Sequence, residues 1–271
     1  MRKGLAKFDS MLDFLQQLEK PIDENNPSFN QGVSDDREAY RFEFTGTHSL
    51  KQAMQLATNG WPEGLKKIQR ALDDIEALPA VEVLPVFDVC GEAFNLDAVL
   101  QGQPENMFYF MPQESNKPRV IQLGFNFSFG HSVSAESIIE RGAAIASAVN
   151  DIEHTGIRVE LYAFHATKKN GYHSSIFIKL KDADQPLELE RVVFAAAHPS
   201  MLRRLWLRYA EQQEDWKKRY TETYGAPCDP KHEHFTEAGF DDQMIKVDSD
   251  TMQPDEVKRS IQQQLDSILK N

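Results

Sequence analysis

The sequence predicts a three-layer α/β fold, in which a sheet carries helices on both faces. Residues 118–129 alternate between apolar and polar positions and are rich in β-forming residues, as is typical of a strand. Residues 135–154 repeat apolar side chains at helical spacing, Gly156 ends that helix, and residues 157–166 form a second strand-like run. A strand, a helix and a strand joined by short connections indicate a parallel crossover.

The residues before this crossover are predicted to be mainly helical. Apolar residues recur at helical spacing from Leu5 to Leu18, and a loop rich in Asn, Pro, Gly, Ser and Asp follows. The next expected elements are a short strand over 41–44, a helix over 49–58 capped by Ser49 or Thr47, and a helix that starts near Trp61 with Pro62 in its first turn.

The elements after these are shorter, except for one helix. Residues 81–110 are strand-like but interrupted by Pro and Gly, so short strands and turns are expected. The further expected elements are a strand over 174–180, a short helix over 187–197, a long helix over 199–224 and a final helix over 257–269. Acidic residues accumulate after Gly225, and we expect a loosely packed arm there.

These patterns divide the chain of 271 residues into three parts. They are an N-terminal helical arm over 1–58, an α/β core domain over 59–224, and an acidic C-terminal arm over 225–271 that ends in a short helix. Hydrophobic residues make up 41% of the chain, which is ordinary for a globular protein. One main domain with appended arms is the simplest organisation.

Composition and charge restrict the location and the partners of the protein. The sequence has no run of about 18 apolar residues and no secretion signal, so it predicts a cytoplasmic protein without a membrane partner. The net charge of -12 disfavours non-specific contact with duplex DNA, because an acidic surface repels phosphate. Cys90 and Cys228 lie far apart without a CxxC motif, and no cofactor is expected.

Polar residues follow the strand at 118–129, where ligands collect in open parallel sheets. The stretch LGFNFSFGHSVSAESIIERGAAIASAVNDIEHTGIRVELYAF resembles the opening of a von Willebrand factor A domain. In that family a strand ends in an Asp-x-Ser-x-Ser metal motif before a helix. The corresponding positions here are Asn126, Ser128 and Gly130. The resemblance implies a von Willebrand A-like sheet with a degenerate metal motif.

Two interpretations of this turn are open. Asn126 and Ser128 are candidate ligands of a divalent cation, but such a cation prefers anionic oxygen ligands, and Asn126 in place of aspartate removes the main charge. In the other interpretation Asn126 and Ser128 turn the chain, and Ser134 caps the following helix. We favour the second interpretation and expect no metal.

A second group of polar residues lies in the C-terminal arm. Cys228, Asp229, His232, Glu233 and His234 are all residue types that bind zinc. His232 and His234 are only two positions apart, and no second ligand pair stands at a known spacing, so a solvated loop is favoured. His165 and His173 are the residues that the fold would have to bring to this group to complete a site.

The long helix predicted over 199–224 carries an aromatic stripe flanked by cations. The aromatic residues are Trp206, Tyr209, Trp216 and Tyr220, and the cations are Arg203, Arg204, Arg208, Lys217, Lys218 and Arg219. Rings that stack on bases beside cations that contact phosphates are typical of single-stranded nucleic-acid binding. Lys168 and Lys169 would add to a positive groove if they share a face with this helix. The alternative is that the stripe packs in the core.

No motif in the sequence singles out an enzyme. The chain lacks the G-x-S-x-G, phosphate-loop, Rossmann and HExxH patterns. Adjacent acids such as Asp73 and Asp74 point apart on a helix and do not share a proton. We therefore expect a non-catalytic protein and rank a metal-dependent hydrolase last.

Three motifs carry a second resemblance. They are GWPEGLKK from Gly60, GQPENM from Gly102 and RGAAIASAVNDIEHTGIRVEL from Arg141. Together they resemble a poorly characterised family of tailed bacteriophages and some bacteria. In phages that package their own RNA polymerase, a further small protein binds single-stranded DNA and recruits a second polymerase for middle transcription. The resemblance implies single-stranded DNA and a phage RNA polymerase as partners, in the host cytoplasm.

Two function hypotheses follow from these observations. The first is a non-catalytic phage factor that holds single-stranded DNA on the face between Arg203 and Tyr220 and recruits an RNA polymerase. The second is a von Willebrand A-like adaptor that binds proteins and has no role in DNA binding. DNA affinity that falls as salt rises distinguishes the first hypothesis from the second.

Overall fold

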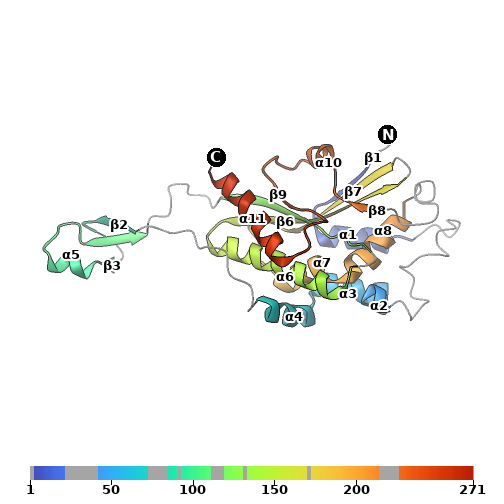
Figure 1. Cartoon of the computed structure of the whole chain (residues 1–271), viewed down its shortest axis with the longest axis horizontal. Helices are drawn as coiled ribbons and strands as arrows, with labels where there is room; N and C mark the ends of the chain where they lie inside the picture. The colour runs from blue at the N-terminus through green and yellow to red at the C-terminus, as the bar shows by residue number, and fades with distance from the viewer. Residues whose placement is uncertain are drawn as a thin grey trace.

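A computed structural model shows a mixed α/β protein (Figure 1). The structure describes residues 3–21, 42–72, 85–90, 93–110, 119–130, 133–169, 172–213 and 226–270. No helix in these ranges is both long enough and apolar enough to cross a membrane.

A mixed sheet forms the centre of the main body (Figure 1). Its strand order is β1-β7-β6-β5-β9, and the short strand β8 also pairs with β6. Parallel pairs join β1 to β7, β5 to β6 and β5 to β9, whereas β6 is antiparallel to β7 and to β8. The strands are β1 (Lys3–Phe8), β5 (Val120–Asn126), β6 (Arg158–Lys169), β7 (Tyr172–Lys181), β8 (Ala226–Cys228) and β9 (Ile245–Val247).

The predicted parallel crossover is confirmed. Strand β5 pairs with β6 so that Val120 is opposite Arg158, and α6 (Ala135–His154) connects the two strands. Ser134 is the N-cap of α6, and its hydroxyl accepts a hydrogen bond from the Ser137 amide at 3.1 Å. The cap satisfies an amide that has no partner within the helix, which fixes where the helix begins.

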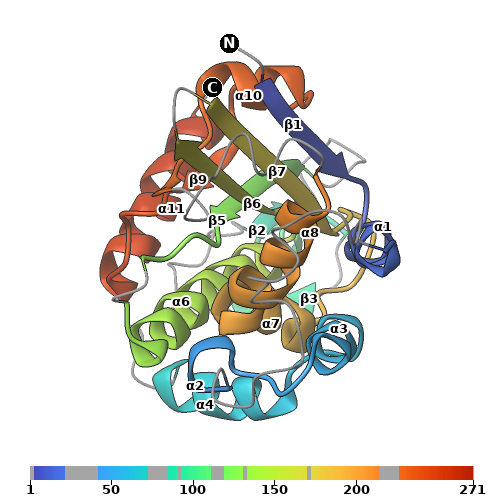
Figure 2. The same cartoon turned by 90° about the vertical axis from the view of Figure 1, so that its right-hand side faces the viewer.

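Most helices pack against one face of this sheet (Figure 2). The elements on this side are α1 (Met11–Glu19), α2 (Phe42–Thr45), α3 (Leu50–Asn59), α4 (Pro62–Leu72), α6, α7 (Leu189–Ala197), the π-helical turn η3 (Met201–Trp206), α8 (Leu207–Glu211) and α11 (Pro254–Leu269). Phe14, Leu123 and Phe194 are completely buried between the helices and the sheet. Ser49 caps α3 and Pro62 begins α4, so both of these helix predictions are confirmed.

The opposite face of the sheet is covered by α10 (His232–Glu237) and the residues after it. Phe164 and Phe177 from the strands pack against Phe235 and Phe240. The ring centroids of Phe164 and Phe235 are 5.3 Å apart in an edge-to-face arrangement, which aromatic rings prefer. This second core binds the C-terminal part of the chain to the sheet.

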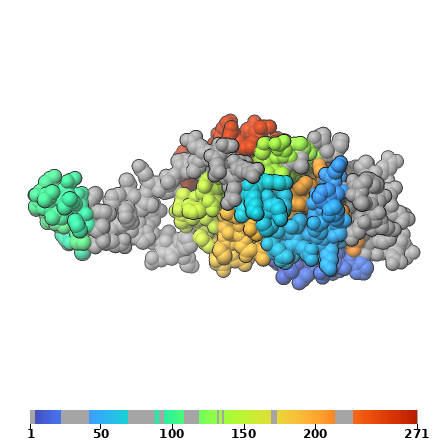
Figure 3. All heavy atoms as spheres, turned by 90° about the horizontal axis from the view of Figure 1, so that it is seen from below, coloured from blue at the N-terminus to red at the C-terminus, as the bar shows by residue number. Residues whose placement is uncertain are grey.

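Residues 85–90 and 93–110 form a small sheet of their own, and we call the segment 85–110 the small module. Its strands β2 (Pro85–Asp88), β3 (Ala93–Phe94) and β4 (Met107–Phe110) pair antiparallel in the order β2-β4-β3, and α5 (Leu96–Leu100) follows β3. The small module lies apart from the main body (Figures 1 and 3). The short strands and turns expected for this part of the chain are confirmed.

Two expectations for the N-terminal part are wrong. Leu5 and Phe8 belong to strand β1, and helix α1 begins only at Met11 with Ser10 as its cap. A strand was expected over 41–44, but residues 42–45 are helical. Both segments follow their tertiary surroundings, because β1 extends the sheet beside β7 and α2 packs on η3.

The expectation of a loosely packed arm after Gly225 is also wrong. Strands β8 and β9 join the main sheet, and Val257, Ile261 and Leu265 of α11 are buried in the main core. The acidic residues that suggested a loose arm lie on the outer side of this packed segment: Asp241, Asp242, Asp248, Asp250, Asp255 and Glu256 are all exposed.

The long helix predicted over 199–224 has a different form in its described part. Pro199 and Ser200 are helical, the π-helical turn η3 follows them, and the helix continues as α8 to Glu211. Residues 214–225 lie outside the described ranges. A π-helical turn is uncommon and is often found beside functional sites, which draws attention to Trp206 at its end.

Candidate functional site

The polar turn after β5 is buried and occupied by internal hydrogen bonds. Asn126 and Ser128 are 0% and 1% exposed. The Asn126 amide nitrogen donates to the Asp229 carboxylate at 2.6 Å and to the Cys228 carbonyl at 3.1 Å, and its oxygen accepts from the Ser128 amide at 2.8 Å. The Ser128 hydroxyl shares a hydrogen bond with Nδ1 of His165. The bond between Asn126 and Ser128 is the one expected of residues that turn the chain. The bonds to Cys228, Asp229 and His165 join this turn to distant segments.

A guanidinium group lies beside this turn. Arg141 of α6 donates to the carbonyls of Asn126 at 3.0 Å, Thr251 at 2.7 Å and Asp248 at 3.0 Å. Burial lowers the pKa of Arg141 to about 10, although nearby carboxylates, Asp229 first among them, oppose the shift. A positive charge therefore already lies at the carboxyl end of β5. This buried positive charge opposes a divalent cation at the turn, and the Asp229 carboxylate is already bound to Asn126.

The predicted zinc-ligand types are only partly brought together. Cys228 Sγ lies 3.4 Å from Nε2 of His173, and the rings of His173 and His234 are 4.9 Å apart. His232 and Glu233 are exposed, and His165 faces the other side of the sheet against Trp206. In the described ranges no group of three or more His, Cys, Asp or Glu residues is arranged to hold a metal ion.

Burial shifts the pKa values of both Cys228 and His173. Burial raises the pKa of the Cys228 thiol, and Asp229 adds to that rise. Burial also lowers the pKa of His173, with a further contribution from His234. Both shifts favour the neutral forms at pH 7, whereas a cysteine nucleophile requires a thiolate.

Two arginines of the predicted nucleic-acid stripe are buried. Arg203 is 7% exposed, donates to the Phe44 carbonyl at 3.0 Å and lies 4.4 Å from the centre of that ring. Arg204 is 1% exposed and donates to the Thr47 carbonyl at 2.8 Å. These guanidinium groups hold the segment around α2 against η3, so they do not form an open surface for phosphates.

Arg208, Lys168 and Lys169, the other described cations predicted to bind nucleic acid, do not share one surface. Arg208 donates to the carbonyls of Leu18 at 3.3 Å and Lys20 at 3.2 Å and so joins α8 to the end of α1. Lys168 is exposed and pairs across the hairpin with His173, which places it on the α10 side of the sheet, and Lys169 pairs with Tyr172. The structure therefore does not place Lys168 on the face that carries α8. The remaining predicted residues, Trp216, Lys217, Lys218, Arg219 and Tyr220, lie outside the described ranges.

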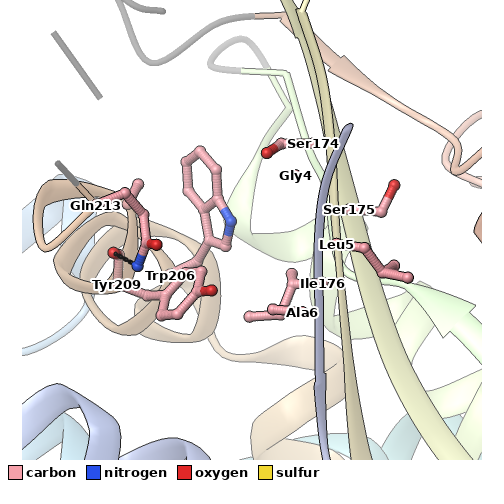
Figure 4. Close-up of a pocket in the computed structure, with 10 residues that line it drawn as sticks. Gly4, Leu5, Ala6, Ser174, Ser175, Ile176, Trp206, Tyr209 and Gln213 are labelled. Atoms are coloured by element: carbon pink, nitrogen blue, oxygen red, sulfur yellow. Dashed lines mark hydrogen bonds between the residues drawn. The ribbon is translucent and has the colours of Figure 1, made fainter. Parts of the chain in front are cut away.

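Two aromatic residues of the stripe line a cavity of about 120 Å³ between α8 and the edge of the sheet (Figure 4). We call this cavity the edge pocket. Its lining residues are Gly4, Leu5 and Ala6 of β1, Ser174, Ser175 and Ile176 of β7, and Trp206, Tyr209, Ala210 and Gln213 on the helical side. Strand β1 is the outermost strand at this edge of the described sheet.

The lining of the edge pocket suits an uncharged, planar group. Trp206 and Tyr209 face the sheet, and the Ser174 hydroxyl points towards them (Figure 4). Gln213 adds an amide, whose nitrogen donates to the Tyr209 carbonyl at 3.1 Å. No lining residue carries a charge. An engineered cavity of about 150 Å³ binds benzene, and the edge pocket, at about 120 Å³, is somewhat smaller than that cavity.

The sequence singled out Trp206 and Tyr209 as part of a stripe that either binds nucleic acid or packs in the core. Trp206 is 6% exposed and belongs to the main core, and Tyr209 packs against that core, as the second interpretation expects. The sequence did not indicate the wall formed by β1. Leu5 faces the second aromatic core, whereas Ala6 and Phe8 pack towards the main core. A strand with apolar residues on both faces shows no clear alternation, and the three-residue spacing of Leu5 and Phe8 imitated a helix. No local signal identified β1 as an edge strand.

These observations define a class of protein. It is a mixed α/β protein in which the guanidinium group of Arg141 lies beside a buried turn at the end of β5, and an uncharged pocket lies at the edge of the sheet. Residues 2–269 match the family described as "Domain of unknown function (DUF7192)", and the chain belongs to that family. No curated protein and no solved structure gives a significant match to the chain.

Proposed function

We propose that this protein is a non-catalytic factor that binds single-stranded DNA and recruits an RNA polymerase. The edge pocket is the observation that carries the first part of the proposal, because Trp206 and Tyr209 form a ring-lined wall opposite Ser174. Stacking of a base on an aromatic side chain contributes about 1 to 3 kcal/mol. The uncharged lining suits a base better than it suits a phosphate.

The sequence supplies cations for the phosphates of a bound strand. Lys217, Lys218 and Arg219 follow Gln213 in the sequence by four to six positions and lie outside the described ranges. In this proposal they contact phosphates next to the base that enters the edge pocket.

A single strand is the form of DNA that this arrangement favours. A base enters a pocket only after it leaves its stack, and an unpaired strand requires less energy for this than a duplex. The net charge of -12 also disfavours non-specific contact with a duplex. The polymerase partner and the host cytoplasm as the place of action are proposed from the resemblance to phage proteins.

The test is a fluorescence-anisotropy titration of labelled single-stranded and duplex oligonucleotides at two salt concentrations. Ser174→Leu places a larger side chain in the edge pocket, and we expect it to weaken single-strand binding at least tenfold. Gln213→Leu removes the amide and is expected to act in the same direction. Gln263→Leu makes the same change on an exposed position of α11 and should have no effect.

A folded Ser174→Leu variant with unchanged affinity would contradict the pocket proposal, and equal binding of duplex would contradict the preference for single strands. Melting temperatures establish that each variant is folded. Arg204 is unsuitable for this test, because its burial means that a substitution would disturb the fold itself.

A protein-binding adaptor is the second candidate function, and the topology favours it. We propose that β5, α6 and β6, followed by the antiparallel strand β7, form a von Willebrand A-like core with helices on both faces. The turn at Asn126 and Ser128 would be its degenerate metal position, with Arg141 in place of the cation. An adaptor would show no salt-sensitive affinity for oligonucleotides.

A further inference from the structure

The small module exposes apolar side chains that a folded unit would normally cover. Leu96, Val99 and Leu100 of α5 are 59%, 43% and 76% exposed, and Phe94 before them is 62% exposed. Val89, in the turn after β2, is 61% exposed. Contiguous exposed apolar residues in a folded protein are typical of a binding surface.

The three apolar residues of α5 lie on one side of the helix. Leu96, Val99 and Leu100 are spaced three and four residues apart, which places them along a single face. Ala98 is the member of α5 that is buried, at 5% exposure. The helix thus turns its small residue inward and its large residues outward, as a helix that binds in a groove of a partner does.

The charge of the small module restricts that partner. Residues 85–110 contain Asp88, Glu92, Asp97 and Glu105 and no lysine or arginine. Nucleic acids and anionic lipid surfaces would be repelled by this charge. A second copy of the chain, with its net charge of -12, would be repelled as well.

We propose that the face formed by Phe94, Leu96, Val99 and Leu100 docks into an apolar groove that is rimmed by lysine and arginine on a partner protein. The exposed apolar residues supply the contact area, and the described acids Asp88, Asp97 and Glu105 pair with the basic rim and exclude other partners. This inference goes beyond the proposed DNA binding, because the edge pocket lies in the main body and shares no residue with the small module.

A first test uses designed helical peptides as probes of this chemistry. One peptide carries a leucine face with lysine on its flanks, and the second carries the same leucine face with glutamate. We expect the full chain to bind the lysine peptide at least tenfold more tightly than the glutamate peptide in fluorescence anisotropy. Leu96→Gln with Leu100→Gln should weaken that binding at least tenfold.

The matched control is Leu12→Gln, which changes a leucine of similar exposure, 58%, on α1 of the main body. Loss of peptide binding in Leu12→Gln, or full binding in the double variant, would overturn the proposal. Single-stranded oligonucleotide affinity should be unchanged in the double variant, so failure of this inference and failure of the proposed DNA binding give different results.

A second test identifies the natural partner surface. A photo-crosslinking amino acid replaces Phe94 in the full chain, in the cells that normally produce it, and the crosslinked peptide is identified by mass spectrometry. We expect a protein segment with apolar residues flanked by lysine or arginine, and at least a tenfold lower yield when Leu96 and Leu100 are also changed to glutamine. A crosslink to an acidic segment, to a second copy or to lipid would overturn the proposal, as would no crosslink above that from the same amino acid at Leu12.

Discussion

Burial holds two histidines of the main body in the neutral form. Burial lowers the pKa of His165 to about 3, and burial together with Lys67 lowers the pKa of His198 to about 4. In the unfolded chain both groups titrate near their usual pKa of about 6.5. Below that pH the unfolded chain binds protons that the folded chain does not, so acid favours unfolding.

We therefore expect stability that is complete above about pH 6.5 and declines as the pH falls towards 4. At pH 5 the free energy of unfolding should be lower by about 2 kcal/mol for each histidine than at pH 7. Urea denaturation at the two pH values measures this difference. His165→Gln should reduce the difference by about half, whereas His154→Gln, at an exposed position, should leave it unchanged. Equal stability at pH 5 and pH 7 would contradict the argument.

Close contact between two helices explains a glycine within α6. A Cβ added at Gly142 would lie 2.5 Å from the Cβ and 3.0 Å from the Cα of Ala197 in α7. Alanine usually stabilises a helix relative to glycine by up to about 1 kcal/mol. Here the helix preference of alanine is opposed by a clash with Ala197, because neither the Cβ nor the Cα of that residue can rotate away.

Gly142→Ala should therefore lower the free energy of unfolding by about 1 to 3 kcal/mol, the usual cost of overpacking. Urea denaturation measures the change. Glu140→Ala, at an exposed position of the same helix, is the control and should shift stability by less than about 0.5 kcal/mol. A more stable Gly142→Ala variant would show that α6 and α7 are free to separate.

Within the described ranges, the molecule consists of a main body and a small module that do not share a hydrophobic core. Neither hydrophobic core of the main body includes a described residue of the small module. Helix α11, in contrast, contributes Val257, Ile261 and Leu265 to the main core although it lies near the end of the chain. The position of a segment in the sequence therefore does not indicate whether the main body needs that segment for stability.

Replacement of residues 85–110 by a short Gly-Ser linker should leave the melting temperature of the main body unchanged, because no described side chain of this segment belongs to a core of the main body. Removal of 254–269 should abolish the cooperative transition, because each large apolar residue removed from a core costs about 2 to 5 kcal/mol. Differential scanning calorimetry measures both. A lower melting temperature after replacement of 85–110, together with an unchanged transition after removal of 254–269, would refute this division of the molecule.

Only part of the candidate site could be predicted from the sequence. Spacing placed Trp206 and Tyr209 on one helical face, and both line the edge pocket. Spacing could not show that Arg203 and Arg204 are buried, because their acceptors, the Phe44 and Thr47 carbonyls, are more than 150 positions away in the chain. The sequence around an arginine is the same whether its guanidinium group is hydrated or bound to a carbonyl of a distant segment.

The sequence by itself determined the elements whose signals are local. The apolar period of α6, its Ser134 cap and the strands on either side were read correctly, because each depends on residues within a few positions. Tertiary structure alone decided that Leu5 lies in an edge strand, that α11 completes the core and that β1 closes the edge pocket. The physical reason is that these outcomes depend on pairing and burial between distant segments, whose free energy no local pattern records.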